Sequence, residues 1–129
     1  MPHGDVPTVG YRVDVGDASI GFSSDQVGTN PAFTNLIRQV EVLVVHFAAS
    51  ENPRPGTAAL HATPSMWGQM AAEGQVRSVV LSHRSESDPS HPGYGSHTGS
   101  DFEGSVANLR SRYDGLITAA EDLLCVAVE

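Results

Sequence analysis

Histidine and aspartate residues fall at the ends of the predicted strands in this sequence. Asp25 follows an alternating segment, and His46 and His83 each end an apolar run. His61 stands just before a predicted helix. The carboxyl ends of strands in an open α/β sheet meet at one edge, where ligands usually bind. Imidazole and carboxylate groups gathered at such an edge suit Zn²⁺, Mn²⁺ or Fe²⁺, so the pattern predicts a metal site there.

The elements that would position these residues can be read from the hydrophobic pattern. Tyr11 to Val15 alternates and predicts a strand, joined by a turn at 16–17 to a second hairpin arm over 18–23. Near-continuous apolar runs predict buried strands at 40–48 and 76–82, and one or two closing strands are expected within 116–128. Helices are expected after the Asn30-Pro31 start, from Thr63 to a stop at Gly74, and over 101–113. This order indicates an α/β fold with a mixed sheet.

The composition indicates which kind of protein this is and which partners it is expected to bind. The chain has 129 residues with 40% hydrophobic, which fits one small globular domain. Its net charge of -8 argues against an extended nucleic-acid-binding surface. Cys125 is the single cysteine, which excludes an internal disulfide and a thiolate zinc cluster, and its apolar neighbours predict burial. Neither a membrane-length apolar segment nor a signal peptide is visible, so no membrane partner and a cytoplasmic location are expected.

Several segments resemble ribonuclease Z-like members of the metallo-β-lactamase superfamily, and they come in the family's order along nearly the whole chain. The opening resembles a segment in which a metal-binding His precedes a "VP..GYR" strand, and a later strand resembles one ending in "SGDT". Other stretches resemble "aDLLIHEA", a segment from "H.T...AG.IA" to "L.LSH", and the closing "Y.G.V..A.DL" strands. The stretches concerned are PHGDVPTVGYRVDV, ASIGFSSDQVG, VEVLVVHFA, LHATPSMWGQMAAEGQVRSVVLSH and YDGLITAAEDLL.

This resemblance implies a fold, a cofactor and a role for each matched residue. The fold implied is half of an αββα metallo-β-lactamase sandwich, a mixed sheet with helices on one face. The cofactor implied is a pair of divalent ions, Zn²⁺ with Mn²⁺ or Fe²⁺ as alternatives. His3 would bind the first ion, Asp25 would bridge both, and His83 would bind the second. His61 would contact the scissile group or assist the leaving group, and His46 would support the metal ligands.

The sequence also departs from the family pattern. The "HxHxDH" motif, which belongs to the N-terminal half of the fold, does not occur, so residues 1–129 are interpreted as the C-terminal half only. Phe47 stands where the family has the Glu of "HEA". The loop after His83 is long, contains His91 and His97, and lacks the "FS.RY" continuation of true ribonuclease Z. These departures favour a less specialised hydrolase over tRNA processing.

Two functions from different classes follow. The first is a metal-dependent hydrolase of phosphodiesters or other esters, acting on a small-molecule or nucleotide substrate. This chain would be its C-terminal part and would be inactive alone. The second is a non-catalytic half-domain without a complete metal site, which self-associates as a homo-oligomer through its exposed sheet face.

Each candidate residue also has a purely structural interpretation. Asp25 fits turn chemistry in a Ser- and Gly-rich loop, and His83 fits a packed histidine at a strand end. His3 lies in a segment where fraying is common, and His61 fits a residue that caps or staples a helix. His46 ends an apolar run, which favours a hydrogen-bonded core histidine.

Overall fold

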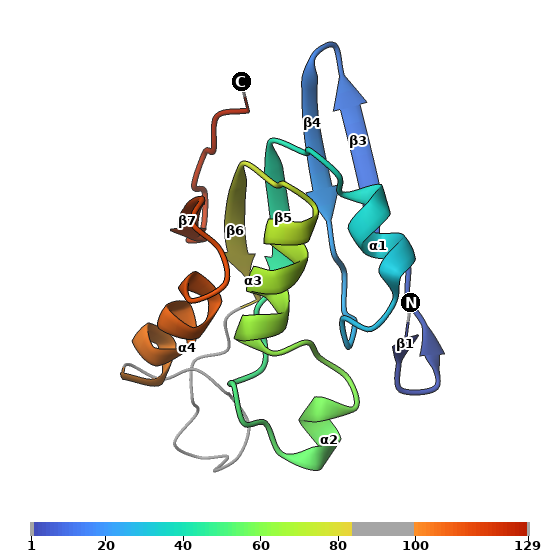
Figure 1. The fold of residues 1–129 in the computed structure, drawn as a ribbon, viewed down its shortest axis with the longest axis vertical. Coiled ribbons are helices and arrows are strands. Elements are labelled where there is room, and N and C mark those ends of the chain that lie inside the picture. Colours follow the sequence, from blue (N-terminus) through green and yellow to red (C-terminus); the bar gives the residue numbers. More distant parts are fainter. Residues whose placement is uncertain (1, 84–99, 129) are drawn as a thin grey trace.

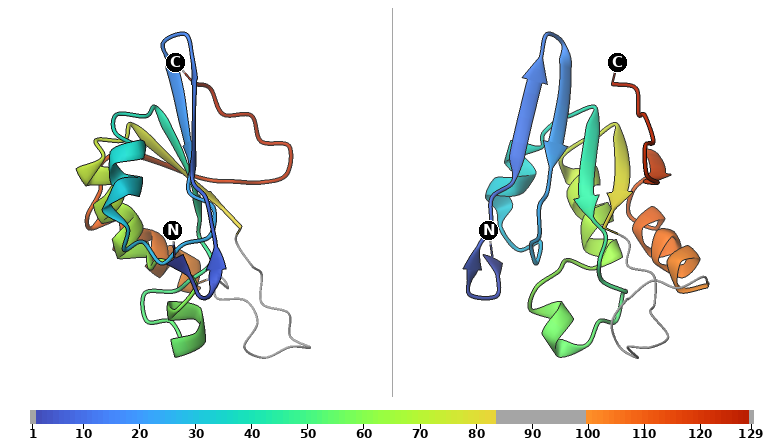
Figure 2. Two further views of the ribbon diagram at one scale, coloured as in Figure 1. Left: turned by 90° about the vertical axis from the view of Figure 1, so that its right-hand side faces the viewer. Right: turned by 180° about the vertical axis from the view of Figure 1, so that it is seen from behind.

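A five-stranded mixed β-sheet with helices on one face organises the chain (Figures 1 and 2). The structure is a computed structural model that describes residues 2–83 and 100–128. The elements, in chain order, are β1 (Pro2–His3), β2 (Val6–Pro7), β3 (Tyr11–Val15), β4 (Ala18–Phe22), α1 (Pro31–Leu36), β5 (Val42–His46), α2 (Pro55–Ala58), α3 (Pro64–Glu73), β6 (Ser78–Ser82), α4 (Ser100–Arg110) and β7 (Leu116–Ala119).

The strand order in the main sheet is β3-β4-β5-β6-β7. β3 and β4 form the expected antiparallel hairpin, and β4, β5, β6 and β7 are parallel neighbours. The hairpin turns at Gly16, whose φ of 60° lies in the left-handed region that glycine adopts without strain. The apolar runs at 40–48 and 76–82 therefore form buried parallel strands as predicted, with shorter limits.

The helices begin where the sequence indicates. Asn30 caps α1, since its side-chain oxygen accepts a hydrogen bond from the Ala32 backbone N–H. α3 begins at Pro64 and ends before Gly74, as predicted. The left-handed residue that ends the helix is Gln75 (φ 54°), whereas Gly74 itself has a right-handed φ of -73°. A Cβ on Gly74 would lie 3.0 Å from the Met70 carbonyl oxygen, so close packing explains this glycine.

The hydrophobic core lies between the sheet and the helices that cover one of its faces (Figure 2). Trp67 of α3 is fully buried, as are Leu43 of β5 and Leu81 of β6. Phe47 is also fully buried and packs edge-on against Phe102 of α4, with ring centroids 6.1 Å apart. The residue that departs from the family pattern at position 47 is therefore a core residue here.

Within residues 2–83 and 100–128, the opposite face of the sheet carries no helix (Figure 2). Gly21 faces α1, because a Cβ on it would lie 3.0 Å from Ile37, so its neighbours in β4 point to the other face. The apolar side chains paired with them in β3 are largely exposed. The exposed large apolar residues on this part of the sheet are Tyr11 (61%), Val13 (46%), Val15 (72%) and Phe22 (39%).

The structure adds elements that the sequence did not predict and corrects the expected burial of Cys125. Two-residue strands β1 and β2 and the single-turn helix α2 were not anticipated. Residues 120–128 form turns and irregular structure, so β7 is the one closing strand among the described residues. Cys125 is exposed, because its apolar segment follows β7 without entering the core. The expected loop at 84–100, with His91 and His97, falls almost entirely outside the described residues.

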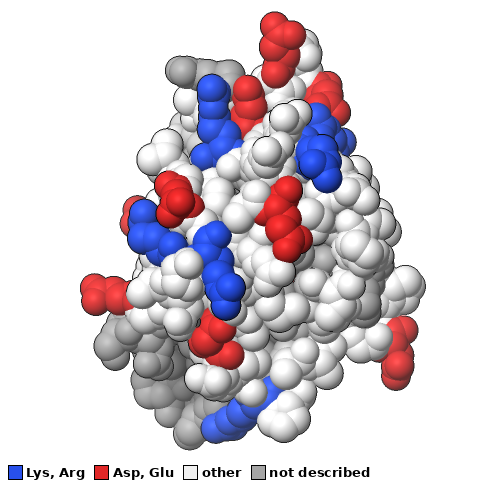
Figure 3. Space-filling model, viewed as in Figure 1, with Lys and Arg blue, Asp and Glu red and all other residues white. Residues whose placement is uncertain are grey.

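The described residues include no helix with the length and hydropathy of a membrane span. On the face seen in Figure 3, Arg side chains are interspersed with Asp and Glu side chains.

Candidate metal centre

The candidate residues gather at the carboxyl edge of the sheet, as the strand ends predicted. Asp25 follows β4, His46 ends β5 and His83 follows β6. The short β1–β2 hairpin and α2 lie at this same end of the molecule and bring His3 and His61 to it (Figure 1).

The centre of the site consists of His3, Asp25 and His61. Each offers one ligand atom, and these atoms all lie within 4.8 Å of one another. Nε2 of His3 is 3.6 Å from Oδ2 of Asp25, and the rings of His3 and His61 meet edge to face with centroids 5.1 Å apart. Two imidazoles and a carboxylate at this separation form a nitrogen and oxygen ligand set of the kind that holds zinc, manganese or iron.

The β1–β2 hairpin fixes the ring of His3. Its Nδ1 donates a hydrogen bond of 2.7 Å to the Leu60 carbonyl, and the Gly4 N–H donates to the Ala59 carbonyl at 3.2 Å. A carbonyl can only accept, so Nδ1 carries a proton and Nε2 is the ring nitrogen that faces Asp25. Metal-binding histidines in proteins are usually oriented in this way. His3 is thus held in place, and the fraying interpretation does not apply.

His61 is placed by α2 and by the loop that carries Asp25. The His61 N–H donates to the Thr57 carbonyl at 2.9 Å, and the next residue, Ala62, donates to the Gln26 carbonyl at 2.7 Å. Burial lowers the pKa of His61, while the Asp25 carboxylate opposes that shift. Nδ1 of His61 is buried and has no hydrogen-bond partner among the described residues. A neutral imidazole with an unsatisfied nitrogen fits a metal ligand.

His46 contacts Asp25, His61 and His83, whereas the sequence predicted only a supporting or core role for it. Its Nδ1 lies 2.5 Å from Oδ1 of Asp25, and its ring stacks on His61 on one side (centroids 5.2 Å, 6°) and on His83 (3.7 Å, 23°). Burial lowers the pKa of His46 to about 4, against the opposing effect of the Asp25 carboxylate, so the ring is neutral at neutral pH. His46 thus contacts the candidate site through Asp25, His61 and His83, whereas the sequence favoured a hydrogen-bonded core histidine.

His83 is more exposed and stands apart from the central ligand set. It has a left-handed φ of 50°, and its ring contacts His46 rather than His3 or Asp25 in the described structure. Its assignment as ligand of a second ion stays a prediction.

Glu51, which the sequence did not single out, caps the N-terminus of α3. Glu51 accepts hydrogen bonds from both the backbone N–H and the hydroxyl of Ser65. The helix lacks a side-chain cap from Thr63, so Glu51 supplies the cap from a distant loop. No local pattern connects residue 51 to residue 65, so sequence reasoning could not have found this contact.

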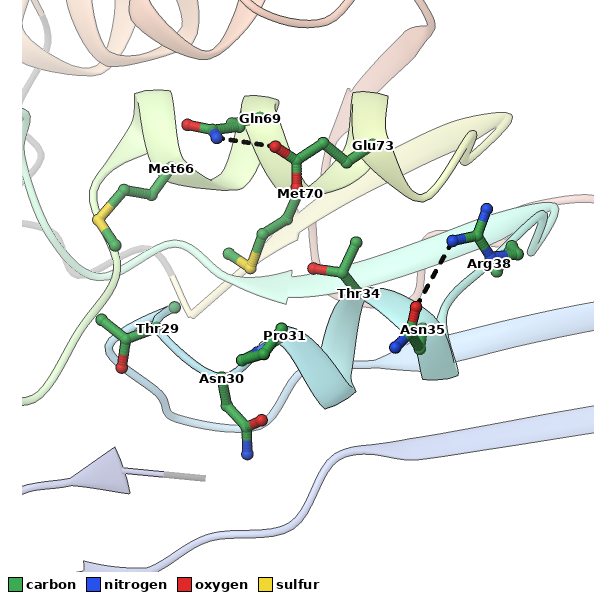
Figure 4. Close-up of a pocket in the computed structure, with 11 residues that line it drawn as sticks. Thr29, Asn30, Pro31, Thr34, Asn35, Arg38, Met66, Gln69, Met70 and Glu73 are labelled. Atoms are coloured by element: carbon green, nitrogen blue, oxygen red, sulfur yellow. Dashed lines mark hydrogen bonds between the residues drawn. The ribbon is translucent and has the colours of Figure 1, made fainter.

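A hollow of about 400 Å³ lies elsewhere, between α1 and α3 (Figure 4). Met66 and Met70 line it, with Thr34, Arg38 and Glu73 among its polar side chains. None of the candidate histidines or Asp25 contributes to it.

The similarity of this chain to known proteins is one of fold. No protein-family model matches the sequence, and no curated protein sequence matches it either. Among solved structures, the metallo-β-lactamase fold protein YhfI from Bacillus subtilis matches with a TM-score of 0.71 and 16% sequence identity. The match covers 93% of this chain and 44% of YhfI.

This chain has part of a metallo-β-lactamase fold. An identity of 16% supports the fold and not a particular activity. Within that fold, the mixed sheet with helices on one face agrees with the architecture expected from the sequence. The chain spans less than half the length of YhfI, so more of that structure lies outside the match than inside it.

Proposed function

We propose that this chain forms part of a metal-dependent hydrolase that cleaves phosphodiesters or other esters, in the ribonuclease Z-like and phosphodiesterase-like branch. The observation that carries the proposal is the set of ligand atoms of His3, Asp25 and His61, all within 4.8 Å of one another. The metallo-β-lactamase fold of the matched structure supports the same chemistry at a coarse level.

The residues of the chain have distinct tasks in this proposal. His3 would bind a divalent ion through Nε2, and Asp25 through Oδ2, with His83 as ligand for a second ion. A bound ion, Zn²⁺ in our proposal, supplies Lewis acidity and lowers the pKa of a coordinated water. His61 would orient the scissile group, or hold a proton for the leaving group at a ring nitrogen. The neutral ring that burial favours suits either a ligand or a hydrogen-bonding role.

We expect the full-length protein to hydrolyse a chromogenic phosphodiester or carboxylic ester in the presence of Zn²⁺ or Mn²⁺. Dialysis against a chelator should abolish this activity, and restoring the ion should recover it, because the ligand set holds no other source of electrophilic activation. Turnover is measured by absorbance, with metal content determined on the same samples. Full activity in a metal-free sample would overturn the proposal.

The second candidate is a non-catalytic module that self-associates. The apolar side chains exposed on β3 and β4 favour it, because contiguous exposed apolar surface usually marks an interaction site. It assigns the uncovered sheet face to a second copy of the chain.

Val13→Asp tests this candidate, since it places a charge in the middle of the exposed apolar face. Sedimentation should show concentration-dependent association of the wild-type chain and a shift towards monomer in the variant, because burying an unpaired carboxylate is costly. Leu36→Asp, at an exposed position on α1, is the matched control and should leave association unchanged. A wild-type chain that stays monomeric at all concentrations would exclude the self-association candidate.

A further inference from the structure

His46 is joined to the candidate site by three separate contacts. Its Nδ1 lies beside Asp25, and its ring stacks with those of His61 and His83. Its backbone N–H donates to the Ser23 hydroxyl at 3.0 Å, which ties the end of β5 to the loop that carries Asp25.

The two carboxylate oxygens of Asp25 have different neighbours. Oδ1 lies 2.5 Å from His46, whereas Oδ2 faces His3 at 3.6 Å. A carboxylate with one oxygen held by a donor cannot turn freely about its terminal bond. The oxygen that faces His3 is therefore the one presented to an ion.

The ring of His46 is itself well fixed. Its side chain is 15% exposed, and Nε2 is buried without a hydrogen-bond partner among the described residues. A carboxylate accepts hydrogen bonds and does not donate them, so the proton of the neutral ring resides on Nδ1. The stacking contacts with His61 and His83 then restrict the plane of the ring, and with it the direction of that N–H.

We propose that His46 is a positioning residue that orients the Asp25 carboxylate for metal binding through its Nδ1–H. The inference rests on the proposed function, because it assumes that Asp25 is a metal ligand. It adds a residue that acts on the ion only through Asp25.

Two variants separate the hydrogen bond from the packing of the ring. His46→Asn places an amide N–H near the position of Nδ1, whereas His46→Gln moves the amide towards the position of Nε2. Both remove the aromatic stack, so a difference between them reports the contact with Asp25. Co²⁺ is titrated into the metal-free 129-residue chain by calorimetry, and thermal unfolding of the metal-free variants checks that they fold.

We expect His46→Gln to weaken Co²⁺ binding by about 10–100-fold, the usual effect of removing a partner of a metal ligand. His46→Asn should stay within a few-fold of the wild-type chain. A second readout needs no metal: the imidazole N–H proton of His46 should give a downfield NMR signal that Asp25→Ala abolishes.

Each other result would overturn the inference. Equal Co²⁺ affinity in the Asn and Gln variants would assign His46 a packing role, and the proposed function would still stand. A wild-type chain that shows the downfield signal but binds no Co²⁺ would overturn the positioning role, whereas the proposed function is decided by metal-dependent turnover of the full-length protein. A variant that unfolds is judged by the NMR signal of the wild-type chain and Asp25→Ala instead.

Discussion

Asp25→Ala should abolish metal-dependent turnover in the full-length protein. Asp25 supplies the one carboxylate of the central ligand set, and both of its oxygens face candidate side chains, His3 and His46. The loss in kcat/KM should exceed the roughly 10–100-fold effect typical of residues that only support a metal ligand. Bound metal, measured on the same preparation, should fall together with activity.

The matched control is Asp17→Asn, at the exposed turn of the β3–β4 hairpin, at the end of the sheet away from the site (Figure 1). It also removes one negative charge and should leave turnover and metal content unchanged. Unchanged activity in Asp25→Ala would contradict the assignment of this residue. Equal losses in both variants would point to a general effect of charge.

Gly68→Ala should destabilise the fold. Gly68 lies in α3 where α4 crosses it, and a Cβ there would stand 2.3 Å from the Leu109 carbonyl oxygen and 3.0 Å from Arg112. Backbone cannot move aside as a side chain can, so the two helices must separate around Trp67 and Leu109, which are fully buried. We expect the free energy of unfolding to fall by about 1–3 kcal/mol, the usual cost of overpacking a core.

Gly104→Ala is the control for the Gly68 prediction. Gly104 is also helical, in α4, but a Cβ on it would meet nothing within 4 Å. Alanine there should stabilise the chain by up to about 1 kcal/mol through helix propensity alone. Urea denaturation followed by circular dichroism measures both variants. A Gly68→Ala variant as stable as the wild-type chain would show that the helices can shift without cost.

The sequence predicted the sheet well because its strands are long apolar runs. The segments around Leu43 and Leu81 had to be buried on both faces, and burial of consecutive side chains is what a central parallel strand provides. From there the carboxyl-edge rule placed Asp25 and His46 together. This part of the site follows from local pattern and general topology.

The remaining features depend on contacts that leave no local pattern. The hairpin that fixes His3 has strands of two residues, too short for any periodicity, and it docks on a carbonyl 57 positions away, that of Leu60. The contact between His46 and Asp25 joins two strand ends through side-chain rotamers, which sequence does not specify. At Cys125 a local pattern misleads, because its apolar segment resembles a strand in sequence but pairs with no strand of the described sheet.

The order β3-β4-β5-β6-β7 follows the chain, and its consequence concerns handedness. Crossovers between parallel strands are right-handed in nearly all proteins. When every new strand is added on the same side of the last, right-handed crossovers must all pass over one face. The sheet is therefore wound in a single direction, and the helices that connect its parallel strands all lie on the same face. The other face can be covered only by a segment that does not connect two of these parallel strands.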